Sequence, residues 1–502
     1  MKTHGTRPAL ADLATALTKA PRMKTGKSTL STLTFTLVFT AMIASCGGGS
    51  GGGAPDNGAE DDTTENEPGK SGIAPSGSLD PDFGTNGIVV NNNAAGKRPD
   101  NKGYAIAIDA SGRILVTGYG HSDDMVIWRY NTDGTLDTSF GTDGMAVHDN
   151  AAGGKGYDEG HAVTVDSSGK ILVTGYSENA NGITDMVIWR YNDNGSPDAR
   201  FGNVGVVVHD SAAGGSYHDR GYDIAIDSKG RILVAGTSYS NAGNYDMVIW
   251  RYNPNGTLDT TFDKDGIVIN DNAAGGNGND TGNSIHIDSK GRILIAGSSQ
   301  NDYGNRGMVI WRYNPDGTLD TSFNSSGMVV YDNNTVTGTG NNSGYSITTD
   351  NLGRILVAGT SSSAYGATDM ALWRYNPDGS PDTTFGTNGV VIHDKAAGGG
   401  SVPSASHDGG RAVTTDSSGK ILVAGYSTGP NDRDMAIWRY NDNGTLDESF
   451  GTNGFVIHNN AAGGNGRDAG RGIAIDSSGR ILVAGYSAAG GDSDMVIWRY
   501  MP

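Results

Sequence analysis

One phrase recurs seven times along the chain, and each copy is built around the same aromatic residue. Its form is Asp-Met-Val-Ile-Trp-Arg-Tyr with small variations, and it contains all the tryptophans of the chain: Trp128, Trp189, Trp250, Trp311, Trp373, Trp438 and Trp498. Successive tryptophans are 61, 61, 61, 62, 65 and 60 residues apart. A fixed period of this length is typical of a repeat architecture. The sequence therefore predicts one array of similar units rather than a set of unrelated domains.

Each unit has the pattern of four short strands. In the copy from Phe140 to Tyr191, runs rich in β-branched and aromatic residues cover 145–148, 161–165, 170–176 and 185–191. Polar turns such as Asp166-Ser167-Ser168-Gly169 separate the runs, and a long polar loop precedes the second run. Four strands per unit are the content of one propeller blade. We therefore predict an all-β fold, a β-propeller with four antiparallel strands in each blade.

The two ends of the array predict how the ring closes. The array begins with an outermost strand near Phe83 to Val90 and ends with the third strand of a blade, Met495 to Tyr500. Together these pieces complete one blade. The outer-strand phrase occurs as often as the tryptophan, at Phe83, Phe140, Phe201, Phe262, Phe323, Phe385 and Phe450. We predict seven blades, closed by strand exchange between the termini, which leaves no unpaired sheet edge.

The repeated Trp, Arg and Asp residues have a structural interpretation. The tryptophans lie within near-continuous apolar runs, so we expect them to be buried between blades. Each is followed by an arginine, and one aspartate per repeat follows Leu or Pro: Asp80, Asp137, Asp198, Asp259, Asp320, Asp382 and Asp447. Because a buried arginine needs a partner, we predict one buried ion pair in each blade rather than seven identical catalytic sites.

The residues before the repeats have the pattern of an exported lipoprotein. Lys24 and Lys27 precede an apolar stretch over 30–43, and small residues lead to Cys46, the one cysteine of the chain. Ile43-Ala44-Ser45-Cys46 resembles the lipobox of bacterial lipoproteins, which implies acylation of Cys46. We predict a signal peptide over 1–45 with the true start at Met23, a lipidated cysteine with a Gly/Ser-rich and acidic tether over 46–77, and the propeller over 78–502. This order predicts a lipid-anchored protein of the bacterial cell envelope, at the outer membrane.

The charge of the chain excludes one class of partner. The formal net charge is −19 at pH 7. A surface this acidic repels phosphate backbones, so we expect no binding to nucleic acid.

Three segments resemble a known family of repeats. They are Leu79-Asp80-Pro81-Asp82-Phe83-Gly84, the run Asp-Ser-Ser-Gly-Arg-Ile-Leu-Val-Ala-Gly at 476–485, and Trp498-Arg499-Tyr500. They are similar to the delta-60 repeat, a bacterial β-propeller family whose blades resemble NHL repeats. The resemblance covers 79 to about 500 and implies the propeller fold. It implies no reaction.

The loops of one face differ between repeats, while the turns of the opposite face are uniform. We call the first the variable face; it contains the loops that enter the inner strands and those that join the second and third strands. Binding residues usually lie on loops of a rigid scaffold. The inner strand opens there with a different residue in each repeat, and we predict that these residues contact a ligand at the rim of the central channel: Tyr104, His161, Tyr222, Asn283, Tyr345, Arg411 and Arg471.

Two further sets of polar residues fall on the variable face. An Asp or Asn precedes each inner strand, at Asn101, Asp158, Asp219, Asp280, Asn342, Asp408 and Asp468, and we interpret these residues as loop caps. Outer strands end in His148, His209, His393 and His458, or in Asn91, Asn270 and Tyr331. We interpret the histidines as strand-end hydrogen-bonding groups of the adjoining loops, because copies one blade apart are too distant to share a metal ion.

Calcium is the one metal ion that the sequence suggests. Asp158, Asp280 and Asp468 each end a Gly-Gly-x-Gly-x-Asp segment, like the start of the calcium nonapeptide. Copies lie a blade apart, and glycine stands where the nonapeptide has a large apolar residue, which excludes a calcium β-roll. Isolated calcium sites at these aspartates remain an alternative.

Signals of enzymatic activity are poor. The segment Gly425-Tyr426-Ser427-Thr428-Gly429 fits G-x-S-x-G, but no helix follows it, so the nucleophile elbow is missing. We predict a non-enzymatic, monomeric propeller that binds a protein or peptide partner of the envelope through its variable face. The alternatives are a propeller that binds a carbohydrate or calcium at the channel mouth and, as a third class, a propeller lyase or hydrolase. A protein binder should expose a broad patch, whereas a glycan site or an enzyme should have a deep pocket with converging polar groups.

Overall fold

The computed structural model describes residues 74–92, 100–120, 123–332, 340–362, 367–398 and 407–502. The predicted signal peptide, Cys46 and most of the predicted tether lie outside these residues. The chain divides into two units, Met1–Gly69 and Lys70–Pro502, and all described residues belong to the second. The described part of the chain contains no helix that is long and apolar enough to cross a membrane.

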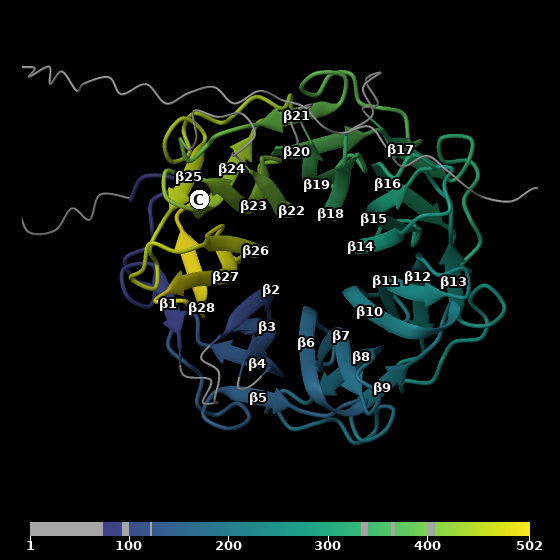
Figure 1. Ribbon diagram of the computed structural model, residues 1–502. Helices are drawn as coiled ribbons and strands as arrows, with labels where there is room; N and C mark the ends of the chain where they lie inside the picture. Colours follow the sequence, from purple (N-terminus) through teal and green to yellow (C-terminus); the bar gives the residue numbers. More distant parts are fainter. Residues whose placement is uncertain (1–73, 93–99, 121–122, 333–339, 363–366, 399–406) are drawn as a thin grey trace, which may run out of the picture. The chain divides into compact units, whose positions relative to one another are not determined.

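Within the described residues, twenty-eight strands form seven antiparallel sheets of four strands each, arranged around a common centre (Figure 1). Three sheets contain β2 (Lys102–Ile108), β3 (Ile114–Gly120), β4 (Asp124–Tyr130) and β5 (Met145–His148); β6 (Gly153–Val165), β7 (Ile171–Asn179), β8 (Thr184–Tyr191) and β9 (Val206–His209); and β10 (Gly214–Ile226), β11 (Ile232–Ser240), β12 (Tyr245–Tyr252) and β13 (Ile267–Asn270). Three more contain β14 (Asp280–Ile287), β15 (Ile293–Gln300), β16 (Arg306–Tyr313) and β17 (Met328–Tyr331); β18 (Asn342–Thr349), β19 (Ile355–Ser362), β20 (Thr368–Tyr375) and β21 (Val390–His393); and β22 (Gly409–Thr415), β23 (Ile421–Thr428), β24 (Arg433–Tyr440) and β25 (Phe455–His458). The seventh has the order β1 (Ile88–Asn91), β28 (Asp492–Tyr500), β27 (Ile481–Ala489) and β26 (Asp468–Ile475).

This architecture confirms the prediction of a seven-bladed β-propeller. In six sheets the first strand lies nearest the centre and the fourth lies outermost, and in the seventh sheet β26 lies nearest the centre and β1 outermost (Figure 1). One expectation about the loops was wrong. The segment before Gly160 was expected to be a polar loop, but β6 already begins at Gly153, and β10 begins equally early at Gly214. Register shifts after Gly153 and Gly214 let these Gly-rich segments pair with the ends of β7 and β11.

The ring closes through the exchanged strand, as predicted. β1 pairs with β28 in an antiparallel register that sets Ile88 opposite Trp498 and Asn91 opposite Met495. The segment before β1 adds side-chain contacts, because Phe83 is fully buried and Asp80 Oδ2 lies 2.8 Å from Arg499 Nε. The outer edge of the last blade is therefore covered by the first strand of the array.

The tryptophans form the core between neighbouring blades. All seven are 0% exposed. Trp250 of β12 packs in one cluster with Leu172 and Ile188 of the preceding blade, and the other tryptophans have equivalent surroundings. Because the phrase recurs once per repeat, it places one large apolar side chain at each blade interface, where burial of its surface stabilises the ring.

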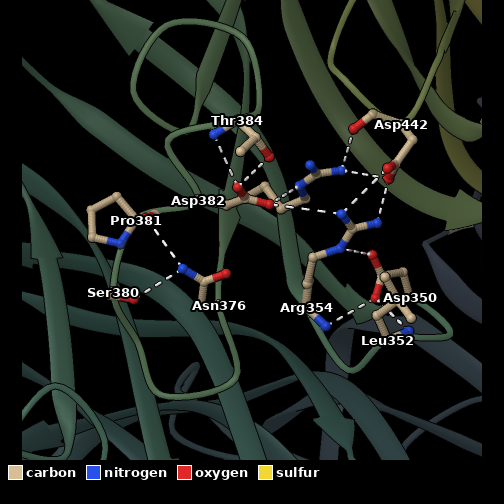
Figure 2. Close-up of polar contacts among 10 residues, drawn as sticks. Asp350, Leu352, Arg354, Asn376, Ser380, Pro381, Asp382, Thr384 and Asp442 are labelled. Carbon is tan, nitrogen blue, oxygen red and sulfur yellow. Dashed lines mark hydrogen bonds and ion pairs between the residues drawn. The ribbon is translucent and has the colours of Figure 1, made fainter.

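Each blade also contains the predicted buried ion pair. Arg251 Nε lies 2.9 Å from Asp259 Oδ2, and its guanidinium lies 4.3 Å from the centre of the Phe262 ring. The equivalent pairs are Arg129–Asp137, Arg190–Asp198, Arg312–Asp320, Arg374–Asp382, Arg439–Asp447 and Arg499–Asp80. In Figure 2, Arg354 of the neighbouring turn joins this network through Asp350, Asp382 and Asp442. These pairs hold the uniform turns together.

The strand-end histidines contact the next blade rather than the adjoining loop. His209 lies with its ring centre 6.1 Å from that of Trp250, and its Nδ1 lies 2.8 Å from the Tyr252 hydroxyl. His148, His393 and His458 approach Trp189, Trp438 and Trp498 in the same way. Our interpretation as hydrogen-bonding groups of the loop was therefore wrong. These side chains are part of the packing between blades.

Candidate functional site

The seven predicted rim residues are each the bulged residue of an inner strand. In every blade the register of the first two strands skips one position, which leaves an unpaired residue between a glycine and the next ladder pair. The unpaired residues are Tyr104, His161, Tyr222, Asn283, Tyr345, Arg411 and Arg471. A β-bulge turns a side chain out of the regular alternation of a strand.

Glycines opposite each bulge make room for it. In the blade of Arg411, a Cβ added to Gly425 would lie 1.8 Å from the carbonyl oxygen of Gly409. No real side chain tolerates this approach, so the position requires glycine. The glycines on both sides of the bulge explain why the rim residue can vary between blades while its position does not.

The structure brings all seven rim residues together around one cavity. The cavity has a volume of about 390 Å³ and is lined by these seven residues. It lies where the inner strands begin, on the variable face. The seven residues, predicted from one equivalent position in each inner strand, thus line a single pocket. That they bind a ligand remains a prediction.

The two arginines give this pocket its charge. Arg411 and Arg471 are half-buried on neighbouring blades, and among the described residues no carboxylate lies within 4.0 Å of either guanidinium. The Nε atom of each is buried and has no hydrogen-bond partner in the described part of the chain. The Arg411 guanidinium instead lies 4.0 Å from the centre of the Tyr345 ring, a cation–π contact that leaves its charge unneutralised.

A second ring of side chains supports the rim, and its residues were not among the predicted site residues. Tyr119, Tyr176, Tyr426 and Tyr486 follow the facing glycine in the second strands, where the other blades have Thr or Ser. The Arg471 guanidinium lies 5.9 Å from the ring centre of Tyr104 and 5.5 Å from that of Tyr486. Lys102 lies 5.2 Å from the centre of Tyr486. In the sequence, the signal for this second ring is that Tyr replaces Thr or Ser after the facing glycine in four of the repeats.

Two phenols beside the arginines, Tyr345 and Tyr486, have lowered pKa values, whereas burial and the charge of Glu159 raise the pKa of Tyr104. Burial raises the pKa of Tyr345, but the Arg411 guanidinium and hydrogen bonds outweigh it, so this pKa falls below its ordinary value. Burial likewise raises the pKa of Tyr486, and the charges of Arg471, Lys102 and Arg433 bring it below its ordinary value. A site that stabilises phenolate also stabilises other anions.

The part of the rim next to Arg471 is aromatic, and the carboxylate of Glu159 lies beside it. His161 stacks on Tyr104 with ring centres 5.1 Å apart, and its Nε2 lies 3.3 Å from Glu159 Oε2. Burial raises the pKa of Glu159, but contacts with His161, Tyr176 and Arg220 lower it below its ordinary value. The negative charge of Glu159 is thus balanced locally by its neighbours, and the cationic side at Arg411 and Arg471 has no such balance.

The aspartates that were predicted to precede the inner strands lie inside β6 and β10 or at or just before the start of the other inner strands, and they cap the loops. Asp219 is fully buried, and its Oδ2 accepts a hydrogen bond of 2.8 Å from the backbone N–H of Ser211, eight residues earlier. Asp158, Asp280, Asp408 and Asp468 accept from the backbone N–H of Asn150, Asn272, Lys395 and Asn460. Their position agrees with the interpretation as caps, although the loops that they close are longer than an Asx-turn.

Two groups of carboxylates on this face have the spacing of a cation site. They are Asp124, Asp149 and Asp158, and Asp369, Asp394 and Asp408, in which the carboxylate oxygens lie within 4.8 Å of one another. Of the three calcium candidates, Asp158 belongs to such a group, while Asp280 and Asp468 belong to none that the described residues form. Calcium binding stays a prediction.

Three of the buried loop-capping aspartates predict that the protein becomes more stable at mildly acidic pH. Burial raises the pKa values of Asp158, Asp219 and Asp280 to about 6 from the ordinary 3.8. Between these values the folded protein binds more protons than the unfolded chain, so its stability rises as the pH falls through 6. We expect a higher melting temperature at pH 5 than at pH 7.5, measured by calorimetry at constant ionic strength.

A matched pair of variants separates this effect from the overall negative charge. Asp219→Asn removes one buried titrating group at a position where two other blades have Asn101 and Asn342. We expect the stability gain between pH 7.5 and pH 5 to shrink by about 1.4 kcal/mol. Asp302→Asn makes the same change of charge at an exposed residue and should keep the wild-type dependence. Equal pH dependence of both variants would contradict the assignment.

Comparisons with known proteins agree with the fold. The family described as "Domain of unknown function (DUF5122) beta-propeller" matches residues 110–140, 167–201, 230–262, 291–323, 353–385, 417–450 and 477–502. A second family, "Beta-propeller repeat", matches residues 204–243. Each DUF5122 match ends in or just after an outer-strand phrase or at the end of the chain. These matches support a repeat β-propeller, and the resemblance to the delta-60 repeat stays a prediction.

No curated protein matches the chain. Among solved structures, a protein of unknown function from Dyadobacter fermentans is 10% identical with a TM-score of 0.41, over 82% of this chain and 98% of that one. A polysaccharide lyase is 12% identical with a TM-score of 0.45, over 79% and 89% of the two chains. An ulvan lyase, described as a new family of polysaccharide lyase, is 14% identical with a TM-score of 0.45, over 82% and 95%. These likenesses concern the fold alone.

Proposed function

We propose that this repeat β-propeller is a binding protein that holds an anionic ligand at the mouth of its central channel. The observation that carries the proposal is the pair Arg411 and Arg471, which line one cavity and have no carboxylate partner among the described residues. A desolvated arginine without a counter-ion costs free energy in the empty protein. A carboxylate or sulfate of a ligand would supply the missing partner through charge-assisted hydrogen bonds.

The geometry favours a small ligand over the broad protein interface of our first prediction. The site is a concave pocket with converging polar groups and shifted tyrosine pKa values, which is the feature expected of a glycan or small-molecule site. Binding of a protein or peptide partner through the variable face remains the alternative. The sequence prediction of a lipid on Cys46 would place this pocket in the cell envelope.

The proposal is tested by calorimetric titration of the propeller with glucuronate, a small anionic sugar. We expect binding that weakens as salt is added, because the attraction between the ligand and the two guanidinium groups is screened. Replacing both arginines with glutamine should weaken binding at least about tenfold, the loss expected when a charged partner is removed. The doubly substituted protein should melt at the temperature of the wild type or above it, since neither arginine belongs to a buried ion pair of the blades and both lack a counter-ion.

Arg306→Gln is the matched control, because it makes the same charge change per site at an exposed residue on the same face. It should bind glucuronate like the wild type. The proposal fails if the Arg411→Gln and Arg471→Gln double variant binds glucuronate as well as the wild type does. It also fails if the neutral sugar maltose binds as tightly as glucuronate.

A further inference from the structure

We infer that the channel mouth recognises a tetrahedral oxyanion with two negative charges, such as a phosphate monoester or free phosphate, and that Arg411 and Arg471 bind it together. This inference rests on the proposed function and adds the charge and shape of the group that the site holds. It is carried by four cations at the mouth, of which two line the cavity and two contact tyrosines of the second ring.

The two rim arginines are held by aromatic rings on neighbouring blades. The Arg411 guanidinium lies 4.0 Å from the ring centre of Tyr345 and 5.4 Å from that of Tyr426. The Arg471 guanidinium has the same two kinds of neighbour, a rim tyrosine at 5.9 Å and a tyrosine of the second ring at 5.5 Å. Contacts with ring faces hold a guanidinium in place and leave most of its N–H groups available to an anion.

Neighbouring positions of the rim are close enough for one anion to contact both arginines. Arg411 and Arg471 are adjacent members of the rim, because they occupy the bulges of two successive blades. Among the other adjacent members, the ring centres of Tyr104 and His161 are 5.1 Å apart, and those of His161 and Tyr222 are 5.5 Å apart. A phosphate monoester offers three acceptor oxygens to two guanidinium groups, whereas a carboxylate offers two.

Two further cations contact the second ring. Lys102 Nζ lies 5.2 Å from the ring centre of Tyr486, and the Arg433 guanidinium lies 4.6 Å from that of Tyr426. Each of these tyrosines therefore contacts one cation of the rim and one outside it. Within the described ranges, no carboxylate lies within 4.0 Å of Lys102 Nζ or of the Arg433 guanidinium.

Two carboxylates stand close to these outer cations in the sequence, and both have other partners. Asp432, which precedes Arg433, has its Oδ1 atom 3.2 Å from Arg467 Nε. Asp100, two residues before Lys102, accepts a hydrogen bond of 2.7 Å from a backbone N–H. The mouth thus has a local excess of positive charge in a chain whose formal net charge is −19. A group with two negative charges offsets this excess better than a group with one.

Two esters of one sugar test the charge of the recognised group. Glucose 6-phosphate is a dianion at pH 7.5, because the second pKa of its phosphate is about 6. Glucose 6-sulfate has the same shape and a single charge. In calorimetric titrations of the intact propeller at pH 7.5, we expect glucose 6-phosphate to bind at least about tenfold more tightly than glucose 6-sulfate.

Single substitutions test whether one group bridges both arginines. Arg411→Gln and Arg471→Gln should each bring the ratio of the two affinities close to one, because a single remaining arginine neutralises only one charge. Lys102→Gln should lower the ratio by a smaller factor, about two- to threefold, since Lys102 does not line the cavity. Arg306→Gln, the exposed control on the same face, should keep the ratio of the wild type.

Inorganic phosphate distinguishes the two sources of the oxyanion. Binding as tight as that of glucose 6-phosphate would support the inference with free phosphate as the ligand, and weaker binding would support it with a phosphate ester.

The remaining outcomes separate this inference from the proposed function. Equal affinities of the wild type for glucose 6-phosphate and glucose 6-sulfate would overturn the inference while the anion site stands. Binding of neither ester and no binding of glucuronate would overturn both. An unchanged ratio in Arg411→Gln or in Arg471→Gln would also contradict the inference, because the two arginines would then not share one group.

Discussion

Removing residues 1–91 should open the ring and lower the unfolding free energy of the protein by more than about 4 kcal/mol. This truncation deletes β1, the outermost strand of the last blade, and with it the fully buried Phe83. It also deletes Asp80, which leaves Arg499 buried without its carboxylate. The exposed edge of β28 would then be free to pair with other chains. We expect a large drop in the denaturation midpoint and concentration-dependent association, measured by urea unfolding and light scattering.

A shorter truncation provides the control. Removing residues 1–73 leaves the exchanged strand and Asp80 in place, and the unfolding curve should match that of the full chain. A peptide of residues 74–92 added to the protein that lacks 1–91 should restore part of the lost stability, because it can pair with β28 again. If both truncations unfold alike, strand exchange does not hold the ring together.

Breaking a single buried ion pair should have the second largest effect. Asp259→Asn removes the charge that neutralises Arg251, whose side chain is 2% exposed, and an uncompensated buried charge costs about 3 kcal/mol or more. The substitution keeps the size of the side chain, so the loss reports the charge rather than a cavity. The measurement is the unfolding free energy from urea denaturation.

Two further variants make the result specific. Asp265→Asn changes the same charge at an exposed residue of the same blade and should alter stability by less than about 0.5 kcal/mol. Replacing Arg251 with methionine and Asp259 with leucine together should recover much of the loss, since no unpaired charge remains in the blade. A neutral result for Asp259→Asn would show that these seven pairs do not stabilise the blades.

The repeat period made the fold predictable from the sequence. Because each 61-residue unit has the same apolar runs and turn residues, every blade makes the same sheet, and the phrase around Trp250 or Trp498 can only be buried between blades. The incomplete units at the two ends implied strand exchange. The early start of β6 at Gly153 was not predictable, because glycine-rich segments have little strand propensity and pair there only through tertiary contacts.

The candidate site was predictable in part for a different reason. Tyr104, Arg411 and their equivalents follow a repeated glycine, so their shared place at the channel mouth could be read from one blade and transferred to the others. The supporting ring of Tyr119, Tyr176 and their equivalents lies on another strand, and the sequence does not show that the bulge brings the two strands' side chains together. That no carboxylate of the described residues lies within 4.0 Å of the Arg411 guanidinium could be learned only from the side-chain positions around the channel mouth.

The anion site at the channel mouth is tested most directly by crystals of the propeller soaked in sodium bromide, with bromide located by anomalous scattering. A bromide ion within the cavity, in contact with the guanidinium groups of Arg411 and Arg471, is the result that our account predicts, and it should be absent from crystals of the double glutamine variant. A cavity without bromide, in crystals that bind the ion at other arginines or lysines, would contradict the proposal that the channel mouth binds an anion.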